Sequence, residues 1–294
     1  MPAEKSVTAI LVTYNSAGVV ASAIASLLAE PKIASVVVVD NCSADGSCEL
    51  IERRFPTVTL IRNTENAGFG RGNNLALARV TTEFALLVNP DAIPQEGAVG
   101  ALLAAAEHYP DAAILAPTLL YEDGRIQPSH KTSLFTRKLY PAPYIRPEGD
   151  ICAEFLSGAL WLLRMEAIRK TGAFDPELFF YYEDDDLCLR LRTAGYALVL
   201  VYEAHAVHAM GNSSAPSRDS RTFRLYHDTW SRLYMEYKYR GKAAAERMST
   251  LQLRRYRWRL CLGRITCIRS LVTRYGTRLR ATRDFIAYLS TAGN

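Results

Sequence analysis

Short apolar runs alternate with amphipathic segments along the first ninety residues of the chain. Four runs, at 6–14, 34–40, 57–62 and 83–89, are rich in β-branched and other apolar residues, which predicts buried parallel strands. Segments with helical spacing lie between them, at 19–30, 44–55 and 70–80. This alternation predicts right-handed crossovers and a doubly wound, mostly parallel α/β sheet, which binds ligands beyond the carboxyl ends of its strands.

Two later runs, at 154–165 and 196–203, predict further strands. Residues 127–150 are rich in Pro, Tyr and basic residues and have no clear periodicity. They predict a long loop that covers the site.

Four consecutive acids, 183–186, open a segment with helical spacing that ends at Gly195. The pattern predicts a short helix whose first turn holds the acids. Helix capping explains one or two of these carboxylates. Four adjacent acids repel one another and favour a nearby cation, metal or proton, so the segment is as well explained by catalysis as by capping.

Polar residues follow each of the first four predicted strands at equivalent positions. Taken singly, each set is typical of a helix cap or a turn. Taken together, they predict one binding crevice, formed by residues 13–15, 40–47, 62–70 and 89–91.

The charge of the chain is unevenly distributed. The 294 residues are 49% hydrophobic and 22% charged, as is ordinary for a folded protein. Residues 1–217 carry 17 Lys/Arg and 25 Asp/Glu, whereas residues 218–294 carry 18 Lys/Arg and 5 Asp/Glu. Two regions with different partners are therefore expected.

The basic region carries one apolar stripe. From Trp258 to Leu279 apolar residues recur three and four positions apart, flanked by arginines, which predicts a single amphipathic helix. Such a helix fits an anionic membrane surface, and it equally fits packing on its own domain or on the partner of a homodimer. Nucleic acid is a less favoured partner, because no nucleic-acid motif accompanies the arginines.

Six cysteines show no metal-binding spacing, and the first residues do not resemble a signal peptide. No run of 18 apolar residues suggests a transmembrane helix. These features favour a reducing cytoplasm.

Seven stretches between residues 6 and 214 carry a family resemblance. In order they are VTYNS, VVVDNCSADGS, NAGFGRGNN, LLVNPDA, FLSGALWLLR, GAFDPELFFYYEDDDLCLRLRTAGY and HAVHAMGNSS. The chain resembles the family 2 inverting glycosyltransferases of the GT-A fold, particularly the bacterial rhamnosyltransferase-like group. The resemblance implies a GT-A nucleotide-sugar-binding and catalytic domain at 1–215, followed by a basic amphipathic helical region at 216–294.

The resemblance also implies a divalent cation, Mg²⁺ or Mn²⁺. The family's D-x-D motif falls on Asn89-Pro90-Asp91, where Asn replaces the first Asp. Asp91 and His208 are the implied metal ligands, and His205 is the alternative histidine.

A general base is implied within the Glu183–Asp184 pair, and Asp184 is favoured. Asp185 stands where the family has an apolar residue. Its carboxylate either raises the pKa of the neighbouring base or points to solvent. Asp186 orients the loop, caps the helix or is itself the base.

The same resemblance assigns nucleotide-sugar contacts to residues that follow the strands. Arg71 has an alternative interpretation as an exposed helix residue. The implied contacts are Thr13, Tyr14, Asn15, Asp40, Asn41, Asp45, Asn66, Gly68, Phe69, Arg71, Asn74, Asn89, Asp91, Ser157 and Gly158.

The function implied by the resemblance is inverting, metal-assisted transfer of L-rhamnose from dTDP-L-rhamnose to a bacterial glycan or lipid-linked acceptor, at the inner face of the cell membrane. A nucleotidyltransferase of sugar phosphates is one alternative. It is less favoured because VTYNSAG replaces the glycine-rich, basic stretch typical of those enzymes. A non-catalytic membrane- or carbohydrate-binding protein of the same fold is the other.

Overall fold

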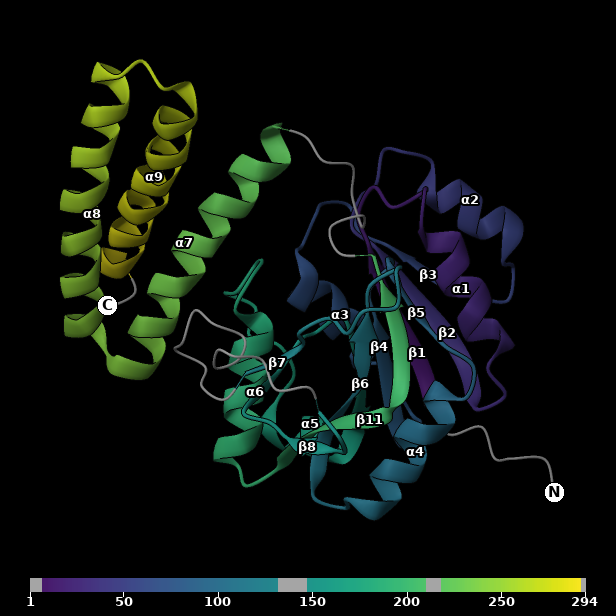
Figure 1. Ribbon diagram of the computed structural model, residues 1–294. Helices are drawn as coiled ribbons and strands as arrows, with labels where there is room; N and C mark the ends of the chain where they lie inside the picture. The colour runs from purple at the N-terminus through teal and green to yellow at the C-terminus, as the bar shows by residue number, and fades with distance from the viewer. Residues whose placement is uncertain (1–6, 132–146, 210–217, 292–294) are drawn as a thin grey trace. The chain divides into compact units, whose positions relative to one another are not determined.

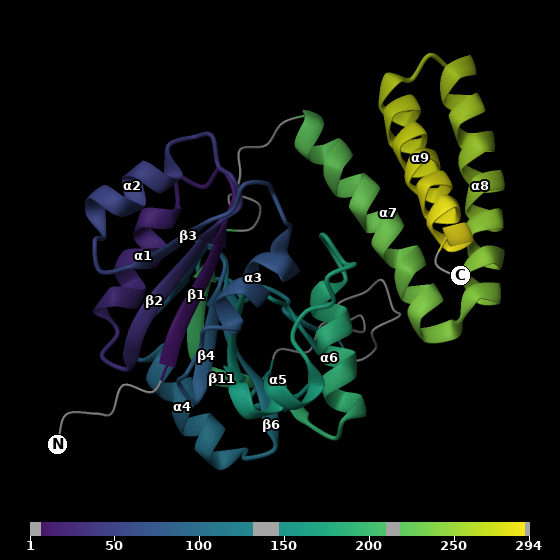
Figure 2. The same cartoon turned by 180° about the vertical axis from the view of Figure 1, so that it is seen from behind.

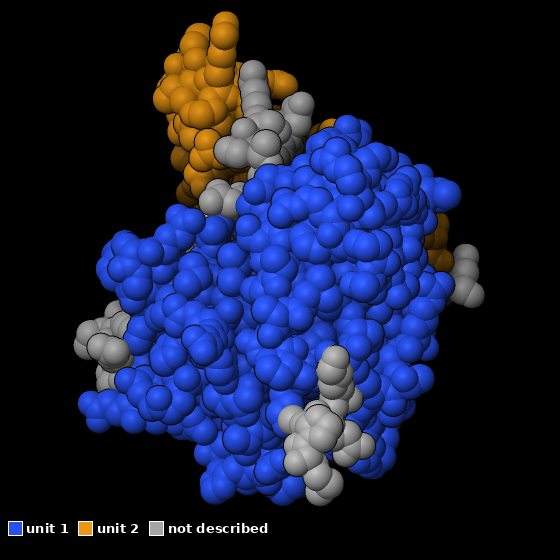
Figure 3. Space-filling model, turned by 90° about the vertical axis from the view of Figure 1, so that its right-hand side faces the viewer, with its two compact units in different colours: residues 1–175, 184–215 blue, residues 176–183, 216–294 orange. Residues whose placement is uncertain are grey.

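The computed structural model describes residues 7–131, 147–209 and 218–291. The chain divides into two compact units: residues 1–175 with 184–215, and residues 176–183 with 216–294 (Figure 3). The predicted division placed the short segment 176–183 in the first domain, whereas in the structure it belongs to the second unit. Leu178 explains this, since its side chain is fully buried in a cluster with Leu233 and Phe285 of that unit.

The first unit is built on a mixed sheet with the strand order β3-β2-β1-β4-β10-β6-β11-β5. The first four strands are parallel and confirm the predicted ones: β1 (Val7–Thr13), β2 (Ile33–Asp40), β3 (Thr59–Arg62) and β4 (Phe84–Val88). Next to β4, β10 (Leu160–Arg164) runs antiparallel and also pairs with β6 (Ala112–Leu120). The last strand, β11 (Ala197–His208), is parallel to β6 and antiparallel to β5 (Ala92–Pro94).

Helices cover both faces of this sheet (Figures 1 and 2). One face packs against α1 (Val20–Ala29), α2 (Ser47–Arg54) and α4 (Ala98–His108), and the other against α3 (Phe69–Leu77), α5 (Met165–Thr171) and α6 (Glu183–Thr193). Because side chains alternate along a strand, Leu11 of β1 enters the first core and Ile10 the second. The chain thus forms a GT-A type three-layer fold, as predicted.

Two of the later strand predictions need correction. The run 154–165 is two strands, β9 (Phe155–Leu156) and β10, because Ser157 N–H donates to the Ser129 carbonyl at 2.7 Å and draws the chain out of the main sheet. Outside the main sheet, β9 pairs with β7 (His130–Lys131) in a separate two-stranded sheet. The strand predicted at 196–203 continues to His208 as β11, which also pairs with β8 (Ile151–Cys152). Of the predicted loop 127–150, residues 132–146 lie outside the described residues.

The second unit contains α7 (Arg218–Arg240), α8 (Lys242–Ile265) and α9 (Arg269–Thr291). The prediction of one helix through 258–279 is wrong, because α8 and α9 form a hairpin. Ile268 N–H donates to the Gly263 carbonyl at 3.0 Å, and Cys267 adopts a left-handed φ of 54°. Gly263 also permits close approach of α9, since a Cβ there would lie 2.9 Å from Leu271 Cβ.

None of the helices in the described part of the chain is both long enough and apolar enough to cross a membrane.

Candidate active site

Asp40 ties the carboxyl ends of β1 and β2 together. Its carboxylate is 2% exposed, and Oδ1 accepts hydrogen bonds from Thr13 Oγ1 at 3.0 Å and Ser43 Oγ at 2.6 Å. The Ser43 N–H donates to Oδ2 at 2.8 Å. Burial and the nearby Asp40 carboxylate raise the pKa of the Cys48 thiol to about 12, so the thiol stays protonated. Asp40 is therefore a buried carboxylate held by several protein donors.

Hydrogen bonds of Asn15 and Asp45 connect the loops that follow β1 and β2. Asn15 has a φ of 52°, and its Oδ1 accepts from the Ala44 N–H, while Asp45 Oδ2 accepts from the Ala17 N–H, both at 2.8 Å. Burial raises the pKa of Asp45, but hydrogen bonds from Ser47 and Ala17 outweigh it and lower that pKa overall. Between these fixed groups Tyr14 is 44% exposed, so its ring is accessible to a ligand.

Asn41 joins the ends of three elements. Its Nδ2 donates to the Gly68 carbonyl at 3.0 Å, and its Oδ1 accepts from Asn63 Nδ2 at 2.7 Å. Asn66 Oδ1 accepts from the Gly68 N–H at 3.0 Å, and Gly68 itself has a φ of 83°. Asn63 lies within the predicted crevice, at 62–70, but was not among the implied nucleotide-sugar contacts.

On α3, Asn74 is engaged by the protein. Its Nδ2 donates to the Phe174 carbonyl at 2.8 Å, and its Oδ1 accepts from the Phe174 N–H at 3.0 Å. Phe69 packs edge-on against the Phe174 ring, with 5.7 Å between centroids. Arg71 is exposed on the same helix. A donor contact from Asn74 thus stays a prediction, and its observed role is to hold the Phe174 loop.

Asp91 and His208 lie together beyond the end of β4. Both are buried, and Asp91 Oδ1 is 3.5 Å from His208 Nε2. The other ring nitrogen, Nδ1, is 2.8 Å from Oε1 of the buried Gln127, an arrangement that fits Nδ1–H donating to the amide oxygen. His205, the alternative histidine, has no such contact with Asp91 among the described residues. Sequence reasoning missed Gln127, because no periodicity distinguishes it within 127–150.

This pair fits a divalent cation. With Nδ1 protonated toward Gln127, His208 directs its Nε2 lone pair at the Asp91 carboxylate, and two acceptors that face each other favour a cation or proton between them. Histidine nitrogen and carboxylate oxygen both suit Mn²⁺, and the oxygen suits Mg²⁺. No group of three or more His, Cys, Asp and Glu residues gathers within the described ranges. The protein would supply a partial ligand set.

Asp184 lies beside the turn that separates β9 from β10. An added Cβ on Gly158 would lie 3.5 Å from Asp184 Cβ and 3.7 Å from its Oδ2, so the glycine keeps the space next to the carboxylate open. The same turn meets the end of β4, because Asn89 N–H donates to the Ala159 carbonyl at 2.9 Å. The fold therefore brings the predicted residues Ser157, Gly158, Asn89 and Asp184 into one neighbourhood.

The four acids at the start of α6 have different environments. Asp185 is 5% exposed, so the alternative in which it points to solvent is wrong. Asp186 is fully buried and accepts from Arg190 Nε at 2.8 Å. Arg190 also donates to the carbonyls of Thr171, Gly172 and Ala173. Asp186 thus fixes the position of Arg190, which holds the loop at 171–173. Glu183 is 7% exposed, and Asp184 is the most accessible carboxylate of the four.

The sequence profile described as Glycosyl transferase family 2 matches residues 8–172. This span contains β1 to β4, the Asp91 turn and the Gly158 turn, and it covers more than half of the chain. The chain belongs to glycosyl transferase family 2.

One relative of this family 2 glycosyltransferase matches almost end to end. It is the N-acetylglucosaminyl-diphospho-decaprenol L-rhamnosyltransferase of Mycobacterium tuberculosis, which is 28% identical over 87% of this chain and 97% of its own length. The similarity therefore includes the helical unit as well as the sheet.

Solved structures share the fold. A mannosyltransferase from Pyrobaculum calidifontis in complex with GDP-Man and Mn²⁺ superposes with a TM-score of 0.58 at 17% identity, over 96% of this chain and 87% of that one. GalNAc-T7 with UDP, GalNAc and Mn²⁺ gives a TM-score of 0.57 at 15% identity, over 80% of this chain and 50% of that one. At these identities the likeness concerns the GT-A fold alone.

Proposed function

We propose that the protein is an inverting rhamnosyltransferase that moves L-rhamnose from dTDP-L-rhamnose to a hydroxyl of a polyprenyl-diphosphate-linked sugar. The observation that carries this proposal is the similarity to the mycobacterial rhamnosyltransferase, which spans 87% of this chain and 97% of the relative. The name of that relative specifies both a rhamnosyl group and an acceptor on a diphospho-lipid.

Asp184 is the proposed general base. Its carboxylate stands next to the space that Gly158 leaves open, where an acceptor hydroxyl can approach. As that oxygen bonds to the anomeric carbon from the face opposite the nucleotide, the carbon–oxygen bond to the diphosphate breaks and the hydroxyl proton passes to Asp184. The product has the inverted anomeric configuration, and the diphosphonucleoside leaves with the electron pair.

Asp91 and His208 are the residues that would hold the divalent cation, with Gln127 fixing the histidine ring. Such a cation would neutralise charge on the diphosphate leaving group. The two Mn²⁺-containing structures of the same fold support a divalent metal here, and the site chemistry accepts Mn²⁺ more readily than Mg²⁺ because one ligand is nitrogen.

The remaining donor contacts are proposed at the carboxyl ends of β1 to β3. Tyr14 is the exposed ring proposed to contact the nucleotide base, and Arg71 is the exposed cation proposed to contact the diphosphate. Asp40, Asn41 and Asp45 support this surface by fixing its loops.

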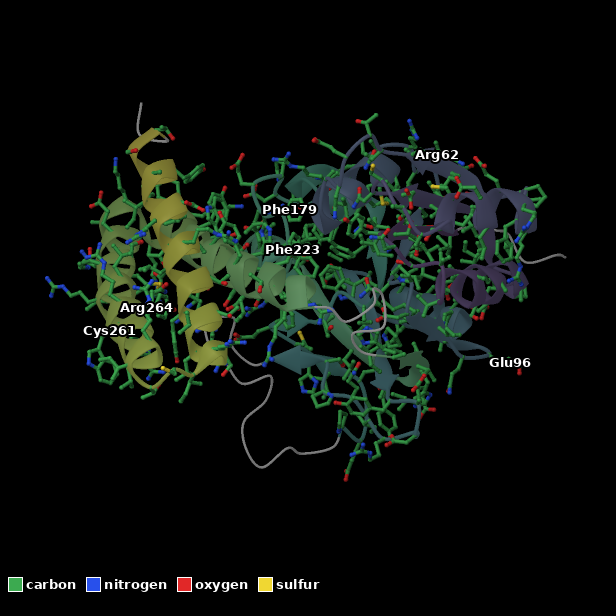
Figure 4. The ribbon with its side chains drawn as sticks, turned by 90° about the horizontal axis from the view of Figure 1, so that it is seen from above. Arg62, Glu96, Phe179, Phe223, Cys261 and Arg264 are labelled. Carbon is green, nitrogen blue, oxygen red and sulfur yellow. The ribbon has the colours of Figure 1, made fainter. Side chains whose placement is uncertain are left out.

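A membrane-facing surface is proposed on α8. Leu251, Trp258, Leu262 and Ile265 are spaced by seven, four and three residues, so they lie on one face, and they are 66, 64, 40 and 75% exposed. The region from 218 to 294 has 18 Lys/Arg against 5 Asp/Glu, and Figure 4 shows Arg264 on this helix. An exposed apolar line on a strongly basic unit complements an anionic bilayer, where the acceptor lipid resides.

The activity test is incubation of the protein with Mn²⁺, a panel of dTDP-, UDP- and GDP-sugars and a polyprenyl-diphosphate-linked N-acetylglucosamine. The proposal predicts dTDP release from dTDP-rhamnose together with a lipid product that has gained one deoxyhexose. Release of pyrophosphate in a parallel incubation with dTTP and a sugar 1-phosphate would instead favour the nucleotidyltransferase. No product with any donor would favour the non-catalytic alternative.

The membrane test is co-sedimentation with phosphatidylglycerol-containing vesicles. Trp258→Ser combined with Ile265→Ser should reduce the bound fraction, as should high salt. Ile286→Ser on α9, where the side chain is 37% exposed, is the matched control and should bind like the parent protein. Equal binding by all three proteins would contradict the α8 surface.

A further inference from the structure

The helical unit contains a cavity of about 790 Å³, between the first half of α7 and the first turns of α9. Four arginines line it: Arg221 and Arg224 from α7, and Arg269 and Arg274 from α9. Tyr181, which belongs to the same unit, lines it as well. A cavity of this size accommodates a small-molecule group.

The charge in the cavity is positive and is not balanced by the protein residues described. Asp228 is the only acid among the described lining residues, and its Oδ2 lies 3.6 Å from Nη2 of Arg278, so a further arginine offsets it. None of the four lining arginines forms an ion pair with a carboxylate that the structure describes. Four guanidinium groups around one space repel each other, and a multiply charged anion relieves that repulsion.

The donors suit phosphate oxygens in particular. Guanidinium groups bind phosphate through paired, parallel hydrogen bonds. The lining also includes the Ser270 hydroxyl, and α9, a helix of 23 residues, begins at Arg269, so its positive end lies at the cavity wall. A group with two or more negative charges, such as a diphosphate, matches this set better than a carboxylate does.

Apolar side chains adjoin the basic ones. Leu225 and Leu271 line the same cavity. Ile268, the residue before Arg269, is 44% exposed, and Ile265 at the end of α8 is 75% exposed. A ligand with a phosphate group in the cavity would thus find apolar surface for a hydrocarbon chain next to it, which favours a phosphorylated lipid over a free phosphate.

We infer that this cavity binds the diphosphate group of the lipid-linked acceptor. The inference rests on the proposed function, because it names where in the helical unit that acceptor is held. It gives the basic unit a specific ligand in addition to a general attraction to the membrane.

Binding is tested first without catalysis. Inorganic pyrophosphate is titrated calorimetrically into the protein with saturating dTDP and Mn²⁺, so that the donor site is filled. Arg224→Gln, Arg269→Gln and Arg274→Gln should each weaken pyrophosphate binding about tenfold or more. The matched control replaces Arg53, Arg79 and Arg283, three exposed arginines outside both the lining and α8, with Gln and should leave the affinity unchanged.

Kinetics then distinguish a lipid diphosphate from a free one. The cavity variants should raise KM for a polyprenyl-diphosphate-linked sugar about tenfold or more, and should leave kcat/KM unchanged for a soluble alkyl glycoside without the diphosphate. Loss of pyrophosphate binding with no change in KM for the lipid-linked sugar would overturn the lipid assignment.

Equal losses in the cavity variants and in the control would reduce the effect to general electrostatics and would also overturn the proposal. A parent protein that transfers rhamnose, with cavity variants that match it in both assays, would refute the cavity and leave the proposed function standing. A parent protein that transfers no sugar would contradict the proposed function and, with it, the acceptor named here.

Discussion

Replacing Arg190 tests whether Asp186 is a structural anchor or part of the chemistry. The Arg190 side chain is 21% exposed and its Nε donates to the fully buried Asp186 carboxylate at 2.8 Å. Its other nitrogens donate to the three carbonyls of Thr171, Gly172 and Ala173. Arg190→Gln would deprive a buried carboxylate of its guanidinium, which costs about 3–5 kcal/mol of unfolding free energy.

The expected cost for Asp186→Asn is smaller, about 1.5–3 kcal/mol, because the amide keeps the shape of the side chain and loses the charge. The double variant should be less destabilised than the sum of the two single changes. Arg192 on the same helix is the matched control. It pairs with Glu154 at 3.5 Å in a partly exposed bridge, so Arg192→Gln should cost at most about 1 kcal/mol.

The assay is urea unfolding followed by circular dichroism, together with turnover per folded molecule in buffer without urea. The account predicts large losses of stability for Arg190→Gln and near-normal turnover for the folded fraction of Asp186→Asn. A stable Asp186→Asn protein without turnover would refute the reasoning and make Asp186 the base.

Three further predictions concern the metal pair, the partly buried His227 and the hairpin. Asp91→Ala should weaken dTDP binding in the presence of Mn²⁺ more than in its absence, and calorimetric titrations that give the same metal effect in the variant and the parent would exclude Asp91 as a ligand. Burial lowers the pKa of His227 to about 4, so this histidine binds a proton more readily in the unfolded chain, and stability falls as pH falls from about 6.5 towards 4. His227→Phe should remove up to about 2 kcal/mol of that pH dependence, measured by unfolding at several pH values. An unchanged dependence of stability on pH would contradict this prediction. Gly263→Ala should lower the free energy of unfolding by about 1–3 kcal/mol because its Cβ would meet Leu271, whereas Gly276→Ala, with nothing within 4 Å, should not, and equal thermal midpoints would refute the steric argument.

The aromatic setting of His227 explains its low pKa. Its ring stacks on Phe179 at 4.7 Å between centroids, and the Phe223 centroid lies 4.4 Å away. Figure 4 labels Phe179 and Phe223, which lie close together. An apolar surround of this kind disfavours the charged imidazolium. Neither sequence spacing nor composition indicates this cluster, because residue 179 and the 223–227 turn of α7 are far apart in the chain.

Local pattern was sufficient for the first half of the fold. The strands at 7–13, 33–40, 59–62 and 84–88 carry runs of apolar residues bounded by polar turns, so their hydrophobic pattern and their pairing agree. The strand β6 was not predicted, because the Ala-rich stretch from α4 into 112–120 shows no change of period. The hairpin of α8 and α9 was not predicted, for a related reason. Spacings of three and four continue through 258–279, and they do not reveal the turn at the left-handed Cys267 or the close approach of the two helices at Gly263.

The candidate site was predictable where a residue follows a strand and unpredictable where a partner comes from elsewhere. Asp91 and His208 were predicted together as metal ligands and lie 3.5 Å apart, whereas Gln127, which orients His208, lies in a segment without a periodic pattern. Asn74 illustrates the reverse case, since a polar residue beside a predicted phosphate loop is engaged by the backbone of Phe174, a hundred residues away.

The most direct test of the account is the turnover of Asp184→Asn with dTDP-rhamnose and a polyprenyl-diphosphate-linked N-acetylglucosamine, measured beside its dTDP affinity. The account predicts a fall in kcat of roughly 10²- to 10⁴-fold, the usual contribution of a positioned base, with the dTDP dissociation constant unchanged. Near-normal turnover by Asp184→Asn, or loss of dTDP binding in parallel with turnover, would contradict the claim that this carboxylate accepts the proton of the acceptor hydroxyl.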